Sequence, residues 1–352
     1  MTADRAGRER MRRERDSDGD RAGSCPARRR GHGHGTSGPV DAADIARVMR
    51  RLELTVVRRL DGLLQGEHLG LLPGPGSEPA AARPYRPGED DVRRMDWGVT
   101  ARTTEPHVRD LVADRELETW ALVDLTASMD FGTARAEKRD LAVAAVAAVG
   151  FLAAGGGNRL GAHLLGPGGV HQLPARSGRP ALLGLVRTLL TAPRAAPSAP
   201  GVPVPPLAQA VAALDRRHRR RGLRVVVSDF LDPDQGWAGP LRRLTARHQV
   251  LAVEVVDPRE LELPDVGLLA VVDPETGRRR EVWTGRRALR TRYAEAAAGH
   301  RLAVRTALRR AGAAHLVLRT DRDWVLDLAR FALDQRRQAR VRPVCPSQRR
   351  VS

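Results

Sequence analysis

Short apolar segments that alternate with longer helical segments constrain the fold of this chain more than any other feature of its sequence. Five segments have the character of strands: Leu117–Val123, Arg159–Leu165, Leu223–Ser228, Val250–Val256 and His315–Arg319. Six helices are predicted between and after them: Lys138–Ala154, Pro180–Leu190, Leu207–His218, Trp237–Arg247, Arg286–Ala311 and Asp323–Leu333. Apolar strands separated by helices are typical of a parallel sheet covered on both faces. The sequence therefore predicts an α/β fold with a mostly parallel sheet and helices on both faces.

The remaining elements are predicted from apolar spacing and from turn residues. Residues 41–65 place apolar side chains at three- and four-residue spacing, which indicates an amphipathic helix that packs on the main body. Residues 66–88 are rich in Gly and Pro and are expected to form a loop. Residues 89–116 should be irregular, with a short strand around His107–Leu111. Residues 268–284 have the pattern of a hairpin with its turn at Pro274-Glu275-Thr276-Gly277.

The positive charge of the chain is concentrated at its two ends. The 352 residues include 60 basic and 42 acidic ones, a formal net charge of +18, and Lys138 is the sole lysine. An arginine bias with abundant Ala, Gly and Pro is typical of a GC-rich, actinobacterial-like genome. Residues 1–38 and 336–352 are dense in Arg and poor in large apolar residues, so both are predicted to be disordered tails. Between them we expect a segment at 39–114 that packs on a main domain at 115–335.

The composition argues against several classes of protein. No row of interleaved basic and aromatic residues crosses the body of the sequence, so the charge alone implies only non-specific attraction to nucleic acid. Cys25 and Cys345 lie in opposite tails, which disfavours a disulfide framework or a cysteine metal site. The sequence shows neither a secretory signal nor an apolar run long enough to span a membrane. We therefore expect a soluble, cytoplasmic protein.

Two of the predicted strands end in carboxylates. Asp124-Leu-Thr126-Ala-Ser128 follows the first strand, and Asp229 follows the strand that ends at Ser228. Ligands of open α/β sheets gather beyond the carboxyl ends of the strands. Because alternate residues of an extended turn point the same way, Asp124, Thr126 and Ser128 are expected to converge on one point. Asp229 is the natural second carboxylate of such a site.

Oxygen donors of this kind favour a hard cation, Mg²⁺ or Mn²⁺. Thr126 and Ser128 are expected to bind it directly, and the two carboxylates to reach it through water. The alternative is that Asp124 and the hydroxyls merely cap the next helix. A phosphatase of the haloacid dehalogenase type needs a second aspartate two residues after the first, and Thr126 stands at that position, which removes the general acid/base. The sequence therefore predicts a cation site for binding and not for catalysis.

The turn and the segment before it resemble a known family. The spacing of Asp124, Thr126 and Ser128 is the D-x-S-x-S pattern of the metal-ion-dependent adhesion site, with Thr126 in place of the first serine. Residues 83–133, which include YRPGEDDVRRMDWGVTAR, resemble the signature of the domain-of-unknown-function family 58. The resemblance continues more loosely through Lys138-Arg139-Asp140 and VVSDFLD to about residue 260.

This resemblance implies a von Willebrand factor A-like (Rossmann-like) fold and no established enzymatic activity. It also implies frequent genetic neighbourhood with MoxR-type AAA+ ATPases and a role in the assembly or maturation of other protein complexes. In an adhesion site the cation keeps one coordination position for an acidic side chain of the partner. The chain is therefore predicted to be a non-enzymatic protein-interaction module that works with such an ATPase.

Two other functions are left open by the sequence. A metal-dependent hydrolase would use the same carboxylates together with Asp130, Asp232 or Asp234 as a general base. A nucleic-acid or membrane-surface binder would act through the Arg-rich tails.

The sequence departs from the family pattern in three respects. Glu89 adds an acidic residue beside Asp90-Asp91. The Pro-rich loop 192–206, which should supply a further Thr ligand, contains none, and Ser198 is a poor substitute. Many family members begin with two membrane-spanning helices, and none is predicted here.

Residues outside the turn are given structural roles. A buried polar brace near the sheet is expected from the signature residues Tyr85, Arg93, Asp96, Trp97 and Arg102. Ordinary structural histidines are expected at His163, His171 and His248, because they lack metal-ligand spacing.

Overall fold

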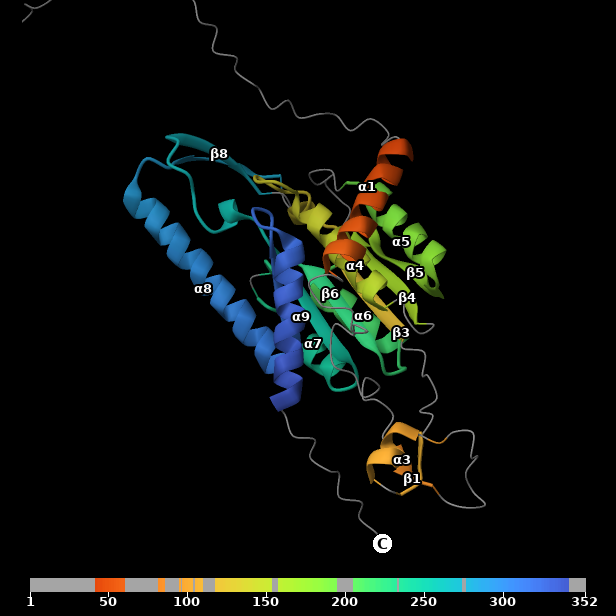
Figure 1. Ribbon diagram of the computed structural model, residues 1–352. Helices are drawn as coiled ribbons and strands as arrows, with labels where there is room; N and C mark the ends of the chain where they lie inside the picture. Colours follow the sequence, from red (N-terminus) through yellow and green to blue (C-terminus); the bar gives the residue numbers. More distant parts are fainter. Residues whose placement is uncertain are drawn as a thin grey trace, which may run out of the picture. The chain divides into compact units, whose positions relative to one another are not determined.

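A six-stranded sheet forms the centre of the computed structural model (Figure 1). The structure describes residues 42–60, 82–85, 95, 97–103, 105–109, 118–153, 158–194, 205–232, 234–273 and 277–341. The predicted N-terminal tail 1–38 and residues 342–352 of the predicted C-terminal tail lie outside these ranges, and so does most of the segment 61–94.

The strands of the sheet follow the order β10-β7-β6-β3-β4-β5. Their bounds are β3 Glu118–Asp124, β4 Arg159–Gly166, β5 Gly169–Ser177, β6 Leu223–Ser228, β7 Gln249–Val256 and β10 Ala314–Arg319. All neighbours are parallel except β5, which pairs antiparallel with β4. The chain thus adds strands on one side of β3 and then on the other, which makes the sheet doubly wound.

Helices cover both faces of the sheet (Figure 1). One face is covered by α1 Ala42–Leu54 with its π-type continuation Thr55–Leu60, α4 Lys138–Ala153, α5 Arg179–Thr191 and α9 Trp324–Val341. The other face is covered by α6 Leu207–Arg217, α7 Ala238–Thr245 and α8 Arg287–Ala311. Successive strand residues alternate between the two cores, as Ala121 and Val123 face the first and Leu122 the second. The predicted fold class is therefore confirmed.

Each predicted strand and helix of the main domain is present, with small shifts at the ends. The predicted hairpin is also present, as β8 Leu268–Val272 and β9 Arg279–Trp283, and its turn residues 274–276 lie outside the described ranges. The strand β5 was not predicted. The last helix, α9, continues to Val341, beyond the predicted domain end at 335.

The family-signature segment is described only in part. It contains β1 Ala82–Pro84, the helix α3 Trp97–Thr103 and β2 His107–Arg109, which pairs antiparallel with β1. The prediction of a buried brace is wrong for two of its members, because Trp97 is 67% exposed and Arg102 is exposed, with its Nε donating to the Gly98 carbonyl 3.0 Å away. Tyr85 is half-buried, and Arg93 and Asp96 lie outside the described residues.

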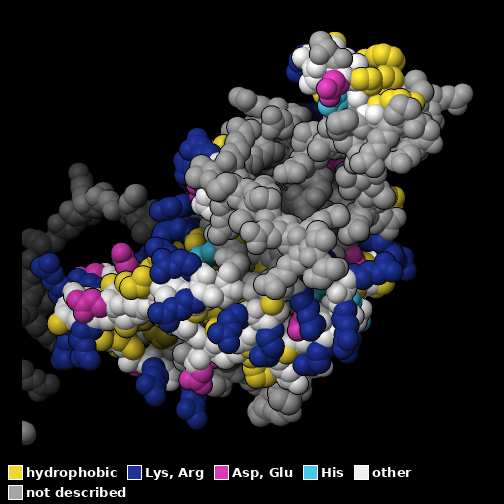
Figure 2. All heavy atoms as spheres, turned by 90° about the horizontal axis from the view of Figure 1, so that it is seen from below, with side chains coloured by type: hydrophobic (Ala, Val, Ile, Leu, Met, Phe, Trp, Pro, Cys, Tyr) yellow, Lys and Arg dark blue, Asp and Glu magenta, His cyan; other side chains and the backbone are white. Residues whose placement is uncertain are grey.

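Within the described ranges, no helix combines the length and apolar character needed to cross a membrane. Figure 2 shows basic side chains spread over the visible face of the described residues, with acidic and apolar side chains between them. The described charge on this face is thus dispersed and does not form a single basic stripe.

Candidate metal centre

The strands β3 and β6 place two carboxylates at the same edge of the sheet. They are parallel neighbours with Val123 opposite Val227, so Asp124 and Ser228 end them side by side and Asp229 follows at once. The direction in which strands are added reverses between β3 and β6. Ligands of open α/β sheets bind at this kind of switch point, beyond the carboxyl ends of the strands. The candidate site therefore lies where the fold is suited to accept a ligand.

The turn after β3 gathers the predicted ligands. Oδ1 of Asp124 accepts a hydrogen bond from the backbone N–H of Thr126 at 3.0 Å, and its Oδ2 accepts one from the Ser228 hydroxyl at 2.7 Å. The hydroxyl oxygens of Thr126 and Ser128 lie 3.1 Å apart, across a short 3-10 turn at Ala127–Met129. Asp124, Thr126 and Ser128 therefore come together, while cation binding by them stays a prediction.

The separation of the two hydroxyls suits neighbouring ligands of a small cation. Mg²⁺ binds oxygen at about 2.1 Å in octahedral geometry, so neighbouring ligands are about 3.0 Å apart. The observed distance between Thr126 Oγ1 and Ser128 Oγ is 3.1 Å. No three His, Cys, Asp or Glu side chains gather as metal ligands within the described ranges, so a metal at this turn depends on its hydroxyls. The donors that are present fit Mg²⁺ or Mn²⁺ in number and hardness.

The turn after β6 has an unusual backbone conformation. Phe230 has a φ of 53°, in the left-handed region that bulky side chains rarely adopt. Its N–H donates to the Ser228 hydroxyl at 3.1 Å, and its carbonyl lies 3.1 Å from Nε2 of His300. Its ring packs edge-on against Trp237, with 5.0 Å between the ring centroids. Strain of this kind persists only where surrounding contacts impose it, and these contacts fix the position of the neighbouring Asp229.

A buried lysine that the sequence analysis did not assign to the site contacts Asp229. Lys138 is the first residue of α4, and its side chain is 0% exposed. Its Nζ donates to Oδ2 of Asp229 at 2.8 Å and also contacts Oε1 of Glu260. An ammonium is a compact point charge, whereas a guanidinium is broad and planar. A sole lysine in a chain that otherwise uses arginine was the signal that could have identified this position.

The two carboxylates of the site differ in their ionisation. Burial and the negative charge of Asp229 raise the pKa of Asp124 to about 6. Burial also opposes ionisation of Asp229, but the ammonium of Lys138 outweighs it, and the pKa of Asp229 is lowered. Burial disfavours the charged form of Lys138, yet its two carboxylate partners raise its pKa, so it stays an ammonium. Asp124 is therefore the carboxylate whose charge is least compensated.

Further charged side chains continue the network beyond Lys138. Arg301 donates to Glu254 at 2.5 Å and to Glu260 at 3.3 Å, and Nε2 of His315 lies 2.7 Å from Glu254. We call the whole group the carboxyl-end cluster: Asp124, Lys138, Asp229, Glu254, Glu260, Arg301 and His315. Its four carboxylates face two permanent cations, so full ionisation leaves an excess of two negative charges (four minus two) when His315 is neutral. A divalent cation would balance that excess, which buried groups otherwise tolerate poorly.

Two of the three general bases considered for a hydrolase, Asp130 and Asp232, have local structural partners. Asp130 forms an ion pair at 2.9 Å with the buried Arg139, which also contacts the carbonyls of Ala192 and Pro193. Oδ1 of Asp232 accepts a hydrogen bond from the N–H of Asp234 at 3.3 Å. The part of the Pro-rich loop that contains Ser198 lies outside the described residues.

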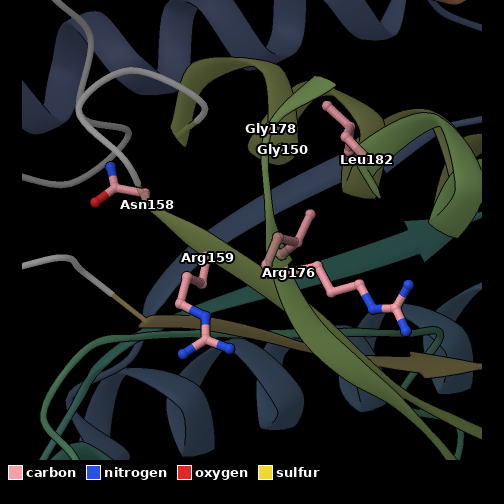
Figure 3. A pocket seen from close by; sticks show the side chains of 7 residues that line it. Gly150, Asn158, Arg159, Arg176, Gly178 and Leu182 are labelled. Carbon is pink, nitrogen blue, oxygen red and sulfur yellow. The ribbon is translucent and has the colours of Figure 1, made fainter. Parts of the chain in front are cut away.

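A small pocket lies at the other end of the sheet (Figure 3). Its lining includes Asn158 and Arg159 at the start of β4, Arg176 near the end of β5, and Leu182 of α5. Its enclosed volume of about 10 Å³ is roughly that of one water molecule. Arg159 lies opposite Glu118, at the start of β3, whereas Asp124 ends that strand. The pocket is therefore separate from the candidate metal centre and too small for a substrate.

Comparison with known sequences identifies relatives over most of the chain. The sequence model described as "Protein of unknown function DUF58" matches residues 81–303. Uncharacterized proteins of Mycobacterium tuberculosis and Mycobacterium bovis are 55% identical over 302 residues, which is 86% of this chain and 93% of theirs. A shorter uncharacterized protein of Mycobacterium avium is 49% identical over 168 residues, 48% of this chain and 96% of its own.

The solved structures that match this chain are distant in sequence, and their TM-scores are below 0.5. The conserved hypothetical protein BatB of Bacteroides thetaiotaomicron has 12% identity and a TM-score of 0.40, and the match covers 63% of this chain and 99% of BatB. A von Willebrand factor type A protein of Catenulispora acidiphila has 11% identity and a TM-score of 0.33, over 62% of this chain and 42% of that one.

Proposed function

Because the chain belongs to the DUF58 family of proteins of unknown function, we propose that it is a non-enzymatic protein-interaction module that recognises its partner through a bound divalent cation. Thr126 and Ser128 bind Mg²⁺ or Mn²⁺ directly, and Asp124 and Asp229 support it. The observation that carries this proposal is the pair of hydroxyls 3.1 Å apart beside two buried carboxylates at the switch point of the sheet.

The cation and the side chains around it have separate roles at this site. The bound cation supplies an open coordination position for an acidic side chain of the partner. Asp124 holds the backbone of the turn through the N–H of Thr126 and is tied to the next strand by the hydroxyl of Ser228. Lys138 neutralises Asp229, so the site does not bury two uncompensated carboxylates when the cation is absent. Binding a partner at such a site requires no general base, in contrast to hydrolysis.

For the partner we propose a MoxR-type AAA+ ATPase, with assembly or maturation of protein complexes as the shared task. The support is the family resemblance of residues 83–133 together with the adhesion-site spacing of the turn. The arrangement of Asp130 also favours binding over hydrolysis, because its carboxylate is engaged by Arg139.

The cation proposal is tested by direct metal binding. Thr126→Val keeps the shape of the side chain but removes a ligand, and Ser128→Ala removes the other. We expect the wild type to bind one Mn²⁺ by electron paramagnetic resonance titration, and each variant to bind it at least about tenfold more weakly, a loss of about 1.4 kcal/mol. Thr119→Val, at a buried threonine on β3, the strand before the turn, is the matched control and should bind as the wild type does. Equal binding by all four proteins would refute the site.

The partner proposal needs a second measurement. A purified MoxR-type ATPase should be retained by the immobilised chain in Mg²⁺ and released by a chelator. The Thr126→Val chain should not retain it under either condition. If the ATPase is retained equally with and without the chelator, and equally by the wild type and Thr126→Val, the interaction does not depend on the cation.

A further inference from the structure

The hairpin of β8 and β9 exposes apolar side chains on both of its faces. Large apolar residues on it and just before it are exposed by 41–58%: Val266, Leu268, Val271, Val272 and Trp283. The pairing sets Leu268 opposite Trp283, so these two lie on one face, and Val271 lies on the other. A two-stranded hairpin that packs on nothing is marginally stable in water. Its apolar surface therefore points to a partner that covers it.

The register of the hairpin shows which backbone groups face outward. The N–H of Thr284 donates to the Gly267 carbonyl at 2.6 Å, and the N–H of Asp273 donates to the Arg278 carbonyl at 2.9 Å. Because hydrogen-bonded and non-hydrogen-bonded pairs alternate, Ala270 and Glu281 form a pair whose N–H groups point away from the hairpin. Neither strand pairs with a further strand among the residues that the structure describes. Both edges are thus able to accept an added strand.

The charge around the hairpin is net positive. Residues 265–292 include seven arginines and four acidic residues, a net charge of +3 (seven minus four). Arg279 and Arg280 lie on β9 itself, with Arg286 and Arg287 at the start of α8, and all four are exposed. A second copy of this chain would bring the same positive charge to the interface, which disfavours self-association. The charge favours an acidic occupant.

The first half of α8 connects this surface to the carboxyl-end cluster. The buried side chains of α8, Val304, Leu308 and Ala311, all lie in its second half. Tyr293, in the first half, is close enough to the cluster that burial and the carboxylate of Glu260 raise its pKa. Farther along the same helix, Arg301 donates to Glu254 and Glu260 of the cluster, so α8 joins the hairpin to the cluster along the chain.

We propose that the hairpin β8–β9 is the docking site for an extended, acidic segment of the partner protein, which pairs with one edge of the hairpin as an added strand. This proposal rests on the proposed function, because it supplies the second contact of the same partner. A lipid surface would leave the outward N–H groups without hydrogen-bond partners, and such groups are costly in apolar surroundings. A nucleic acid would engage the arginines but leave Leu268 and Val272 uncovered. A protein segment satisfies the backbone edge, the apolar side chains and the charge together.

The test uses the full chain and a labelled peptide of about six residues, the usual length of a strand. The peptide alternates Glu and Val and carries fluorescein, and a matched peptide alternates Lys and Val. Binding is measured by fluorescence anisotropy for the wild type, Ala270→Pro, Glu281→Pro and the double variant Arg279→Glu/Arg280→Glu. Proline at 270 or 281 removes an outward N–H and keeps the hydrogen bonds between β8 and β9. Ala288→Pro, in the first turn of α8 where proline is tolerated, is the matched control.

We expect the Glu-Val peptide to bind, and one edge-proline variant and the double arginine variant each to weaken it at least about tenfold, with no loss in Ala288→Pro. Glu281→Pro is the sharper variant, since it also removes a negative charge and electrostatics alone would strengthen binding of an acidic peptide. Equal binding by all variants would overturn the proposal. It would also be overturned if the wild type ignored the peptide but bound phosphatidylglycerol vesicles, or formed a dimer that the edge prolines dissociate.

The same experiment separates this proposal from the cation proposal. Thr126→Val that still binds the peptide would leave the docking site standing, even if Mn²⁺ binding had failed. Mn²⁺ binding by a chain that ignores the peptide would leave the metal centre standing and remove the docking site.

Discussion

Ionisable side chains are buried at both ends of the central sheet, but the two groups differ in their net charge and in the groups that they contact. At the carboxyl ends of the strands, the carboxyl-end cluster combines four carboxylates with Lys138 and Arg301. At the amino ends, a second group, the amino-end cluster, contains Trp120, His163, His218, Arg224 and His248, all buried. The first group has an excess of negative charge, and the second has a buried guanidinium without a carboxylate among its hydrogen-bond acceptors.

The amino-end cluster is stabilised by backbone carbonyls and by ring packing. Arg224 donates to the carbonyls of Glu118 and His218 at 2.9 and 3.0 Å, and burial lowers its pKa to about 10. The ring of His218 stacks on Trp120 with 3.5 Å between centroids, and its Nε2 lies 2.9 Å from Nε2 of His163. Gly161 leaves room for this indole, since a Cβ there would lie 2.5 Å from the Trp120 ring. This group is a packed structural core.

The difference between the clusters distinguishes the proposed cation site from a structural cluster. In the amino-end cluster, burial is the main cause that lowers the pKa values of His163 and His218 to about 4, with His218 next for His163 and Arg224 next for His218, so both imidazoles are neutral at pH 7. In the carboxyl-end cluster, full ionisation with a neutral His315 leaves two negative charges, and the hydroxyls of Thr126 and Ser128 lie in the turn that follows Asp124. The excess negative charge at the carboxyl-end cluster favours a bound cation there, whereas the guanidinium of Arg224 is satisfied by backbone carbonyls.

The largest effect is expected from removing the internal cation of the carboxyl-end cluster. Lys138→Met keeps the length and apolar stem of the side chain but leaves Asp229 and Glu260 without their ammonium. Removing one partner of a buried ion pair typically costs about 3 to 5 kcal/mol. We therefore expect the free energy of unfolding in urea to fall by about 3 kcal/mol. Arg305→Met, at an exposed position on α8, should change it by less than about 0.5 kcal/mol.

Added Mg²⁺ should restore part of the stability of Lys138→Met, because a divalent cation replaces the lost positive charge. A loss below about 1 kcal/mol, or a loss that Mg²⁺ leaves unchanged, would contradict the view that this cluster is built around a missing cation.

The second prediction concerns the amino-end cluster and its response to acid. Both ring nitrogens of the buried His248 lack hydrogen-bond partners among the described residues. His248→Leu removes two unsatisfied polar atoms, and we expect it to raise the free energy of unfolding by about 1 kcal/mol at pH 7. Burial and the charge of Arg224 lower the pKa of His248 from 6.5 to about 4. The folded protein therefore loses stability as the pH falls from about 6.5 toward 4, because the unfolded chain binds the proton first.

The advantage of His248→Leu should thus grow to about 2 kcal/mol at pH 5, after allowance for partial solvent screening. His171→Leu, at an exposed histidine of β5, is the control and should gain nothing on acidification. The free energy of unfolding is measured in urea as a function of pH for the wild type and His248→Leu. Parallel curves would show that burial does not lower the pKa of His248 in the folded protein.

The sequence was sufficient to predict the strands and helices whose pattern of apolar residues agrees with their burial in the structure. The strands β3, β6 and β7 are apolar on both faces because helices cover both faces, and this is what the sequence predicted. The strand β5 escaped prediction because it lies at the edge of the sheet, exposes most of its side chains and contains Gly169 and Pro174. The helix α3 escaped because its residues bury no apolar stripe.

The candidate site could be predicted where its residues share one turn or directly follow a predicted strand. Asp124, Thr126 and Ser128 share one turn, and Asp229 ends the neighbouring strand. Lys138 and Glu260 reach the site from separate elements, 122 positions apart, and no local pattern links them. Trp97 shows a different limit of the sequence. The motif that contains it identified the family, but the motif does not state which of its side chains are buried, and Trp97 is exposed.

The smallest effect in the absence of metal is expected from Asp124→Asn, which distinguishes a ligand from a structural carboxylate. The pKa of Asp124 is raised from 3.8 to about 6, so its ionisation destabilises the cation-free protein as the pH rises from about 4 through 6. An amide removes that penalty above pH 6, but it also weakens the charge-assisted bonds to Thr126 and Ser228. These effects largely offset each other, and we expect the free energy of unfolding of Asp124→Asn to exceed that of the wild type by about 0.5 kcal/mol without metal at pH 7.5.

Saturating Mg²⁺ at about a hundred times its Kd should stabilise the wild type by about 2.7 kcal/mol and the variant far less, so the order of stability reverses. If urea unfolding instead shows Asp124→Asn to be less stable both with and without Mg²⁺, Asp124 is a structural cap like the groups at the other end of the sheet.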